Sequence, residues 1–174
     1  VIGGGHSAIN SLLQLAELKA EFPQTNITWV LRKQRVEEAF GGGSNDELAA
    51  RGELGLRIAK LVKNGTITVQ TPFRIQSISK TEQGIQLKAS TGKLEGLDRL
   101  IVNTGNRPDF QIHSELRFEV DAITEAVPAI APLIDPNEHS CGSVAAHGEK
   151  ELRQSEPNFY IVGSKSYGRA PTFL

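Results

Sequence analysis

The chain has 174 residues and a formal net charge of -1 at pH 7, with 39% hydrophobic and 22% charged residues. This length suits one domain, or one domain with a shorter segment, and the composition is that of a globular protein. The near-neutral charge lacks the strong basic field of a nucleic-acid binder. We therefore do not expect nucleic acid as a partner. We do not expect a membrane as a partner either, because no apolar run approaches the ~20 residues that span a bilayer.

The cysteine content points to a reducing environment. Cys141 is the only cysteine, so an internal disulfide is impossible, and the scattered histidines give no zinc-ligand spacing. We therefore expect a cytoplasmic protein without a metal site. Cys141 is interpreted as a small residue in a Gly/Ser loop in preference to a reactive thiol beside His139.

Hydrophobic periodicity predicts the elements of the first third of the chain. Val1-Ile2 has the character of a short buried strand, and apolar residues at helical spacing predict a helix over 7–22. A β-branched and aromatic run predicts a strand over 27–31. A second helix is expected over 44–62, starting with the Ser-x-x-Glu spacing of a capping box.

From Thr66 the hydrophobic period changes to two. This pattern predicts strands over 66–73, 74–80 and 85–89, and the Gly-containing turns between them predict an antiparallel meander. Leu97 and residues 100–102 are expected to form a short buried strand that ends at Asn103-Thr104-Gly105.

The remainder of the chain has little periodicity. Five of the eight prolines fall between residues 107 and 157, which predicts irregular structure with a short helix near 148–154. A last buried strand is expected over 159–162.

The ends suggest a piece of a longer protein. Only two residues precede the first glycine turn, whereas a strand normally needs about five, and the chain contains no Met. The alternative is a complete chain with trimmed or disordered ends.

The sequence Gly3-x-Gly5-x-x-Ala8 has the spacing of a dinucleotide-binding turn between a strand and a helix. Gly3 permits the tight turn, Gly5 lets a pyrophosphate approach the backbone, and Ala8 lets the helix pack closely on the strand. The N–H groups and positive dipole end of the helix then neutralise phosphate charge. The alternative is a glycine-rich turn that holds nothing.

Three further residues lie within this turn and are expected to contact the cofactor. Gly4 is the second of three consecutive glycines, and His6 is expected to shape the site without proton chemistry. Ser7 donates to a phosphate oxygen or caps the helix, and both roles stay open.

Basic residues follow the second predicted strand, at the place where an acid would bind the ribose of NAD. The sequence has Arg32, Lys33 and Arg35 there. A guanidinium binds a 2′-phosphate with paired, charge-assisted hydrogen bonds, so we expect NADP(H) over NAD(H). The alternative is a solvated basic loop.

Three segments together resemble the pyridine-nucleotide domain of flavoproteins with two dinucleotide-binding domains, such as the thioredoxin-reductase-like and flavin-containing monooxygenase-like enzymes. These segments are the turn at 3–8, the strand-ending I-V-N-T-G-N-R-P at 101–108, and F-Y-I-V-G-S at 159–164. Residues 165–174 look like a group of uncharacterised bacterial NAD(P)/FAD-dependent oxidoreductases.

The resemblance implies an α/β fold. It comprises a three-layer Rossmann-like parallel sheet with an antiparallel β-meander, plus an irregular C-terminal segment. Residues 1–108 would be the NAD(P)-binding Rossmann-like domain, and residues 109–174 an irregular linker and return strand to an FAD-binding domain elsewhere in the full-length chain.

The resemblance also implies cofactor contacts. Thr104 and Gly105 would lie at the carboxyl end of the sheet, where ligands of open α/β sheets bind, and Gly163 and Ser164 would lie along FAD. Ser164 stands where the family usually has Asp, which weakens that contact, and the Cys-x-x-Cys of thioredoxin reductases is missing.

The expected function is therefore the NADPH-binding part of an FAD-dependent oxidoreductase. Hydride would pass from NADPH to flavin, and reduced flavin would pass electrons to oxygen or to a small organic substrate. No catalytic residue is assigned, and we expect the isolated chain to bind NADP(H) without turnover. The alternatives are a flavin-independent NAD(P) dehydrogenase and a non-catalytic nucleotide-sensing module.

Overall fold

The computed structural model describes residues 1–41, 49–134 and 144–169. The chain divides into two compact units, Val1–Thr104 and Gly105–Leu174, whereas the boundary predicted from the sequence follows residue 108. Each unit has a hydrophobic cluster of its own.

The first unit is built on a short parallel sheet. Strand β1 (Ile27–Val30) pairs in parallel with β2 (Ile67–Gln70). The predicted strand at the start of the chain is reduced to Ile2, which forms parallel bridges with Val30 on one side and Val102 on the other. The order across the sheet is therefore β2, β1, Ile2, Val102. Because later segments lie on both sides of Ile2, the strand order reverses there.

Two helices cover one face of this sheet. These are α1 (His6–Glu21) and α2 (Ala49–Lys63), which confirm the two predicted helices. The capping-box residues predicted for the second helix lie outside the described residues. The alternate β1 side chains Ile27 and Trp29 are buried with Leu12 of α1 and Ile58 of α2 in one cluster. Burial of this cluster holds both helices against the sheet.

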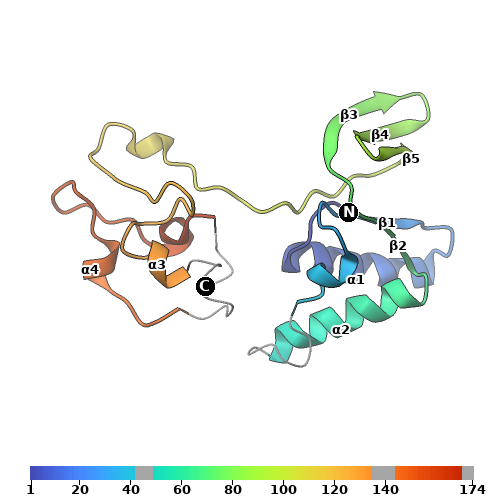
Figure 1. Cartoon of the computed structure of the whole chain (residues 1–174), viewed down its shortest axis with the longest axis horizontal. Helices are drawn as coiled ribbons and strands as arrows, with labels where there is room; N and C mark the ends of the chain where they lie inside the picture. The colour runs from blue at the N-terminus through green and yellow to red at the C-terminus, as the bar shows by residue number, and fades with distance from the viewer. Residues whose placement is uncertain (42–48, 135–143, 170–174) are drawn as a thin grey trace. The chain divides into compact units, whose positions relative to one another are not determined.

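An antiparallel meander covers the other face, as predicted (Figure 1). Its strands differ from the prediction, because residues 67–70 pair in parallel with β1 and residues 92–97, where no strand is predicted, form its third strand. Strands β3 (Ile75–Thr81), β4 (Gly84–Ala89) and β5 (Gly92–Leu97) form an antiparallel sheet in that order. Leu87 of β4 is buried with Ile2 and Val30. Since Trp29 and Val30 enter different clusters, β1 is buried on both of its faces.

The predicted buried strand that joins Leu97 to residues 100–102 is wrong. Leu97 ends β5 and pairs with Ile85 of β4, so the meander uses its backbone groups. Asp98 and Arg99 then lead away as exposed residues, and Val102 forms one bridge with its side chain 55% exposed.

The second unit is held by short helices around a small apolar cluster that includes Val127, Ile130 and Ile161. Helix α4 (Glu149–Leu152) confirms the predicted short helix. The described part of this unit also contains η3 (Gln111–His113), α3 (Ala131–Ile134) and η4 (Gly163–Tyr167). A further short helix, η1 (Val36–Ala39), belongs to the first unit.

The predicted strand over 159–162 is a single antiparallel bridge between Arg153 and Tyr160. Ile161 is buried, but Val162 is 63% exposed. A regular strand needs a partner strand for its backbone groups, and within the described residues of this unit the neighbouring segment is α4.

The described chain is thus mixed α/β, with a two-stranded parallel sheet and a three-stranded antiparallel sheet. Two regular parallel strands do not by themselves establish a complete Rossmann-like sheet. In the ranges that the structure describes, no helix combines the length and the apolar character required to cross a membrane.

Candidate functional site

The glycine turn connects Ile2 to α1 at the carboxyl end of the parallel strands. Gly3 has a φ of +131°, and a Cβ atom there would lie 2.0 Å from the carbonyl oxygen of Asn103. Ala8 is fully buried, and its Cβ would lie 3.5 Å from that same added atom. Only glycine therefore fits at residue 3, and the small Ala8 lets α1 pack closely at the turn.

Hydrogen bonds hold the turn from both sides. The amide of Gly3 donates to the carbonyl of Val30 at 3.3 Å, and the indole Nε1 of Trp29 donates to the carbonyl of Gly3 at 2.7 Å. The side-chain amide of Asn103 donates to the carbonyl of Ser7 at 3.1 Å and to Oγ of Ser11 at 2.8 Å. The turn and the first turn of α1 are thereby attached to the sheet.

Sequence reasoning missed Trp29 and Asn103 as parts of the site. A buried strand residue with a polar ring N–H needs an acceptor, and an asparagine that ends a strand can bind nearby backbone. These two features indicate that Trp29 and Asn103 form hydrogen bonds, but they do not show that the acceptors are the carbonyls of Gly3 and Ser7.

The turn has the features of an anion-binding cradle. Gly5 is the N-cap of α1, with ordinary extended backbone (φ −101°, ψ 178°), and a Cβ added there would meet no atom within 4 Å. Among the described residues, the backbone N–H groups of Gly4 and Gly5 have no hydrogen-bond partner. Two available amide donors and the positive end of a helix dipole beside open space fit a phosphate group.

The remaining turn residues have different roles. Gly4 lies against the strand end, because an added Cβ would be 3.3 Å from Leu31 Cδ2 and 3.5 Å from Lys33 Cε. His6 is half-buried at the first position of α1, and Ser7 is exposed at the second. Since α1 begins at His6, the capping role considered for Ser7 is excluded.

The basic residues after β1 are not equivalent. The ammonium group of Lys33 donates to the carbonyl of Glu38, and the carbonyl of Lys33 accepts a hydrogen bond from Thr71 Oγ1 at 2.5 Å. The backbone N–H of Arg35 donates to the Glu38 carboxylate at 2.9 Å. Arg32 is exposed and has no hydrogen bond or ion pair within the described part of the chain. Among the described residues, the guanidinium groups of Arg32 and Arg35 therefore both keep uncommitted donors, whereas Lys33 supports the loop.

The other predicted contacts lie at the unit boundary and in the second unit. Thr104 is exposed and follows Asn103, whose amide donates to the carbonyl of Ile2 at 2.8 Å. Thr104 thus stands at the same sheet edge as the glycine turn. Gly105 begins the second unit, where exposed Gly163 and Ser164 begin η4.

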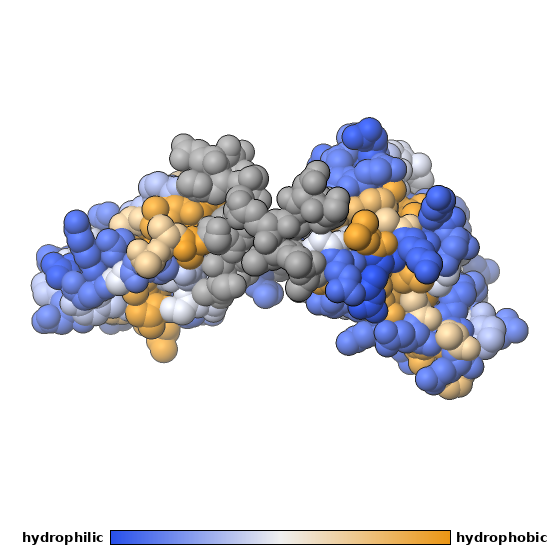
Figure 2. Space-filling model, turned by 90° about the horizontal axis from the view of Figure 1, so that it is seen from below, coloured by the Kyte–Doolittle hydropathy of each residue, from blue (hydrophilic) through white to orange (hydrophobic). Residues whose placement is uncertain are grey.

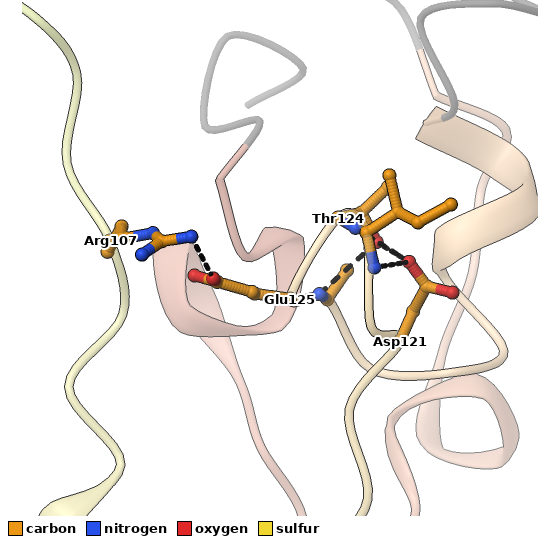
Figure 3. A network of polar contacts seen from close by, with 6 residues as sticks. Arg107, Asp121, Thr124 and Glu125 are labelled. Carbon is orange, nitrogen blue, oxygen red and sulfur yellow. Dashed lines mark hydrogen bonds and ion pairs between the residues drawn. The ribbon is translucent and has the colours of Figure 1, made fainter.

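A polar network organises the loop 121–126 of the second unit (Figure 3). One carboxylate oxygen of Asp121 accepts from the Thr124 amide at 2.6 Å, the Thr124 hydroxyl at 2.8 Å and the Ile123 amide at 3.0 Å. These bonds, the Thr124 amide foremost, lower the pKa of Asp121 below its ordinary value. Arg107 forms an ion pair with Glu125 at 2.8 Å. The Asn-Arg-Pro segment is thereby attached to this loop.

A cavity of about 520 Å³ lies at the amino ends of the parallel strands, whereas the glycine turn lies at their carboxyl ends. It is open to solvent and is lined at the amino end of β1 by Val1, Ile27 and Thr28, together with Leu18, Leu97 and Arg99. No sequence pattern pointed to this cavity, and its mixed lining shows no convergent set of polar groups.

Exposed apolar side chains occur on both units, as the orange areas among polar surface in Figure 2 illustrate. Ile112 is 83% and Ile123 is 75% exposed in the second unit, and Leu56 is 59% exposed in the first. Isolated exposed apolar residues are common on protein surfaces. Within the described ranges no group of three metal-ligating side chains could hold an ion, and Cys141 and His139 lie outside those ranges.

Comparisons with known proteins assign no family. No family model matches the chain. No curated protein matches it either. Any functional assignment therefore depends on the geometry of the glycine turn and on the resemblance of the motifs described above.

The close approach at Gly3 predicts a large loss of stability for Gly3→Ala. The left-handed backbone and the contact with Asn103 together should lower the free energy of unfolding by about 2–6 kcal/mol. Urea denaturation followed by circular dichroism measures it. Gly65→Ala is the control, because Gly65 has a φ of +76° but open space around it. Equal losses for both variants would contradict the close approach.

The Asp121 network predicts a pH-dependent local stability. Because the folded pKa is lowered, the ionised carboxylate stabilises the loop at neutral pH, and this contribution is lost as the pH falls below about 4. Hydrogen exchange measured by NMR should show protection of the Ile123 and Thr124 amides that decreases over that range. In Asp121→Ala, protection should be low throughout; a natural chain whose protection is independent of pH would refute the role.

Proposed function

We propose that Val1–Thr104 is the NADPH-binding part of an FAD-dependent oxidoreductase, built as a three-layer Rossmann-like domain with the meander as its third layer. The observation that carries the proposal is the cradle at residues 3–5, where two amide donors without partners adjoin open space at a helix start. An oligopeptide loop of this form binds a diphosphate without charged side chains.

The position of the turn supports this proposal. In open α/β sheets, ligands bind outside the carboxyl ends of the strands where the strand order reverses. Ile2 lies between Val30 and Val102, and the glycine turn follows it directly. Asn103 and Thr104 stand at the same edge, which is where the nicotinamide half of a dinucleotide would extend from the diphosphate.

The choice of NADPH over NADH rests on Arg32. Its guanidinium follows β1 at the edge of the sheet that holds the turn and is exposed, without a competing carboxylate among the described residues. A guanidinium can bind a phosphate through two parallel N–H donors. The neighbouring Lys33 is engaged by the Glu38 carbonyl, so we assign the 2′-phosphate to Arg32 and loop support to Lys33.

The chemistry that the cofactors supply when bound is hydride transfer from nicotinamide to flavin, with oxygen or a small organic molecule as the final acceptor. This chain's own residues bind and orient the nucleotide. The flavin contacts at Gly163 and Ser164 rest on the sequence resemblance, together with the open space around Gly163 at a φ of +67°.

The 2′-phosphate assignment predicts a selective effect of Arg32→Ala. Calorimetric titration in low salt should show NADPH binding weakened by about 1–3 kcal/mol, with NADH binding nearly unchanged, because only NADPH carries the lost phosphate contact. Arg57→Ala is the charge-matched control on α2, where Arg57 is paired with Glu17 at 3.8 Å. A similar weakening for both nucleotides would rule out this role for Arg32.

The cradle predicts that Gly5→Val abolishes binding of both NADPH and NADH. Its extended backbone and open surroundings accommodate valine, so circular dichroism and urea unfolding should remain close to those of the natural chain. The added side chain would occupy the space for the diphosphate. Gly148→Val is the matched control, because Gly148 is also an N-cap with open surroundings. Retained affinity in Gly5→Val would exclude the turn from the site.

A further inference from the structure

The buried indole of Trp29 makes a contact that its packing does not require. Trp29 is fully buried in β1, 6.3 Å from the ring of Phe40. Its Nε1–H donates to the carbonyl of Gly3 at 2.7 Å, a bond between residues 26 positions apart. A phenylalanine could supply most of the apolar area, but only a side chain with a donor at this place can bind that carbonyl.

This hydrogen bond sets the direction of the next amide. The peptide between Gly3 and Gly4 is trans, because the cis bond of the described chain is Thr71-Pro72. In a trans peptide the C=O and N–H groups point in opposite directions. Since the Gly3 carbonyl faces the buried indole, the Gly4 N–H faces away from it, and it is one of the two cradle amides without a partner.

The peptide plane has little else to fix it. Both flanking residues are glycine, so the plane can rotate without a Cβ obstacle. A rotated peptide would present the Gly3 carbonyl to the cradle, where its partial negative charge would repel an anion. It would also leave the buried indole N–H without an acceptor, which is costly. The indole therefore favours the orientation in which the amide faces the ligand.

We propose that Trp29 is a positioning residue that orients the Gly3–Gly4 peptide so that the Gly4 N–H donates to the diphosphate of the nucleotide. The inference rests on the proposed function, and it adds a residue that acts through the backbone without touching the ligand. The bond is reciprocal: an anion that accepts from Gly4 polarises the peptide and strengthens the bond from the indole.

Trp29 is the single tryptophan of the chain, so a tryptophan analogue that is incorporated in its place changes the indole N–H at this position alone. Replacement of Trp29 by benzothienylalanine exchanges the ring N–H for sulfur and keeps the shape of the side chain. Affinity for inorganic pyrophosphate and for NADPH, measured by calorimetry, should fall about five- to tenfold. Replacement by 5-fluorotryptophan, which keeps the N–H, should leave both affinities unchanged.

A second control separates positioning from stability. Ile58→Val removes a methyl group from the same buried cluster and should lower stability without altering either affinity. In the natural chain, the single tryptophan should give one indole N–H resonance by NMR, and pyrophosphate should shift it downfield. This measurement needs no variant and so does not depend on whether the benzothienylalanine protein folds.

The outcomes distinguish the two proposals. If the natural chain binds both probes but the benzothienylalanine chain binds them equally well, or the indole resonance does not move, the role of Trp29 is refuted and the binding function stands. If the folded natural chain binds neither pyrophosphate nor NADPH, the proposed function is refuted and the role of Trp29 with it.

Discussion

The contact between the backbones of Gly3 and Asn103 is the constraint on which the first unit depends. A side chain at residue 3 would lie 2.0 Å from the Asn103 carbonyl, so only glycine lets Ile2 bridge to Val102. The same approach brings the Asn103 side chain to the start of α1. The absence of a Cβ at Gly3 therefore lets the point where the strand order reverses, the glycine turn and α1 contact one another.

Burial of strand β1 on both of its faces makes the carboxyl end of the parallel sheet rigid. Alternate side chains of β1 enter different clusters, because Trp29 packs with the helices and Val30 packs with the meander. A strand enclosed in this way cannot shift its register without exposing one of its two apolar faces. The exposed Arg32 that follows its end is thus carried by a fixed support, as the proposed binding of a phosphorylated ligand requires.

The second unit is organised by different forces. Its apolar cluster is small, and hydrogen bonds to the Asp121 carboxylate define the adjoining loop. Exposed polar bonds of this kind depend on the ionisation of one group, whereas the clusters of the first unit do not. The two parts of the chain should therefore respond differently to acid, with the loop around Asp121 more sensitive than the parallel sheet.

Local sequence determined the elements whose pattern is complete within a few residues: the helices at 6–21 and 149–152, strand β1, the meander strands β3 and β4, and the glycine turn. Periodicity and turn chemistry act over such distances and are visible in one dimension. The tertiary structure alone decided that Leu97 joins the meander, that residues 159–162 form a single bridge, and that Lys33 is engaged while Arg32 is not. It alone also joined Trp29 to Gly3 and Asn103 to Ser7, which lie 26 and 96 positions apart, because such partners become neighbours only after the chain has folded.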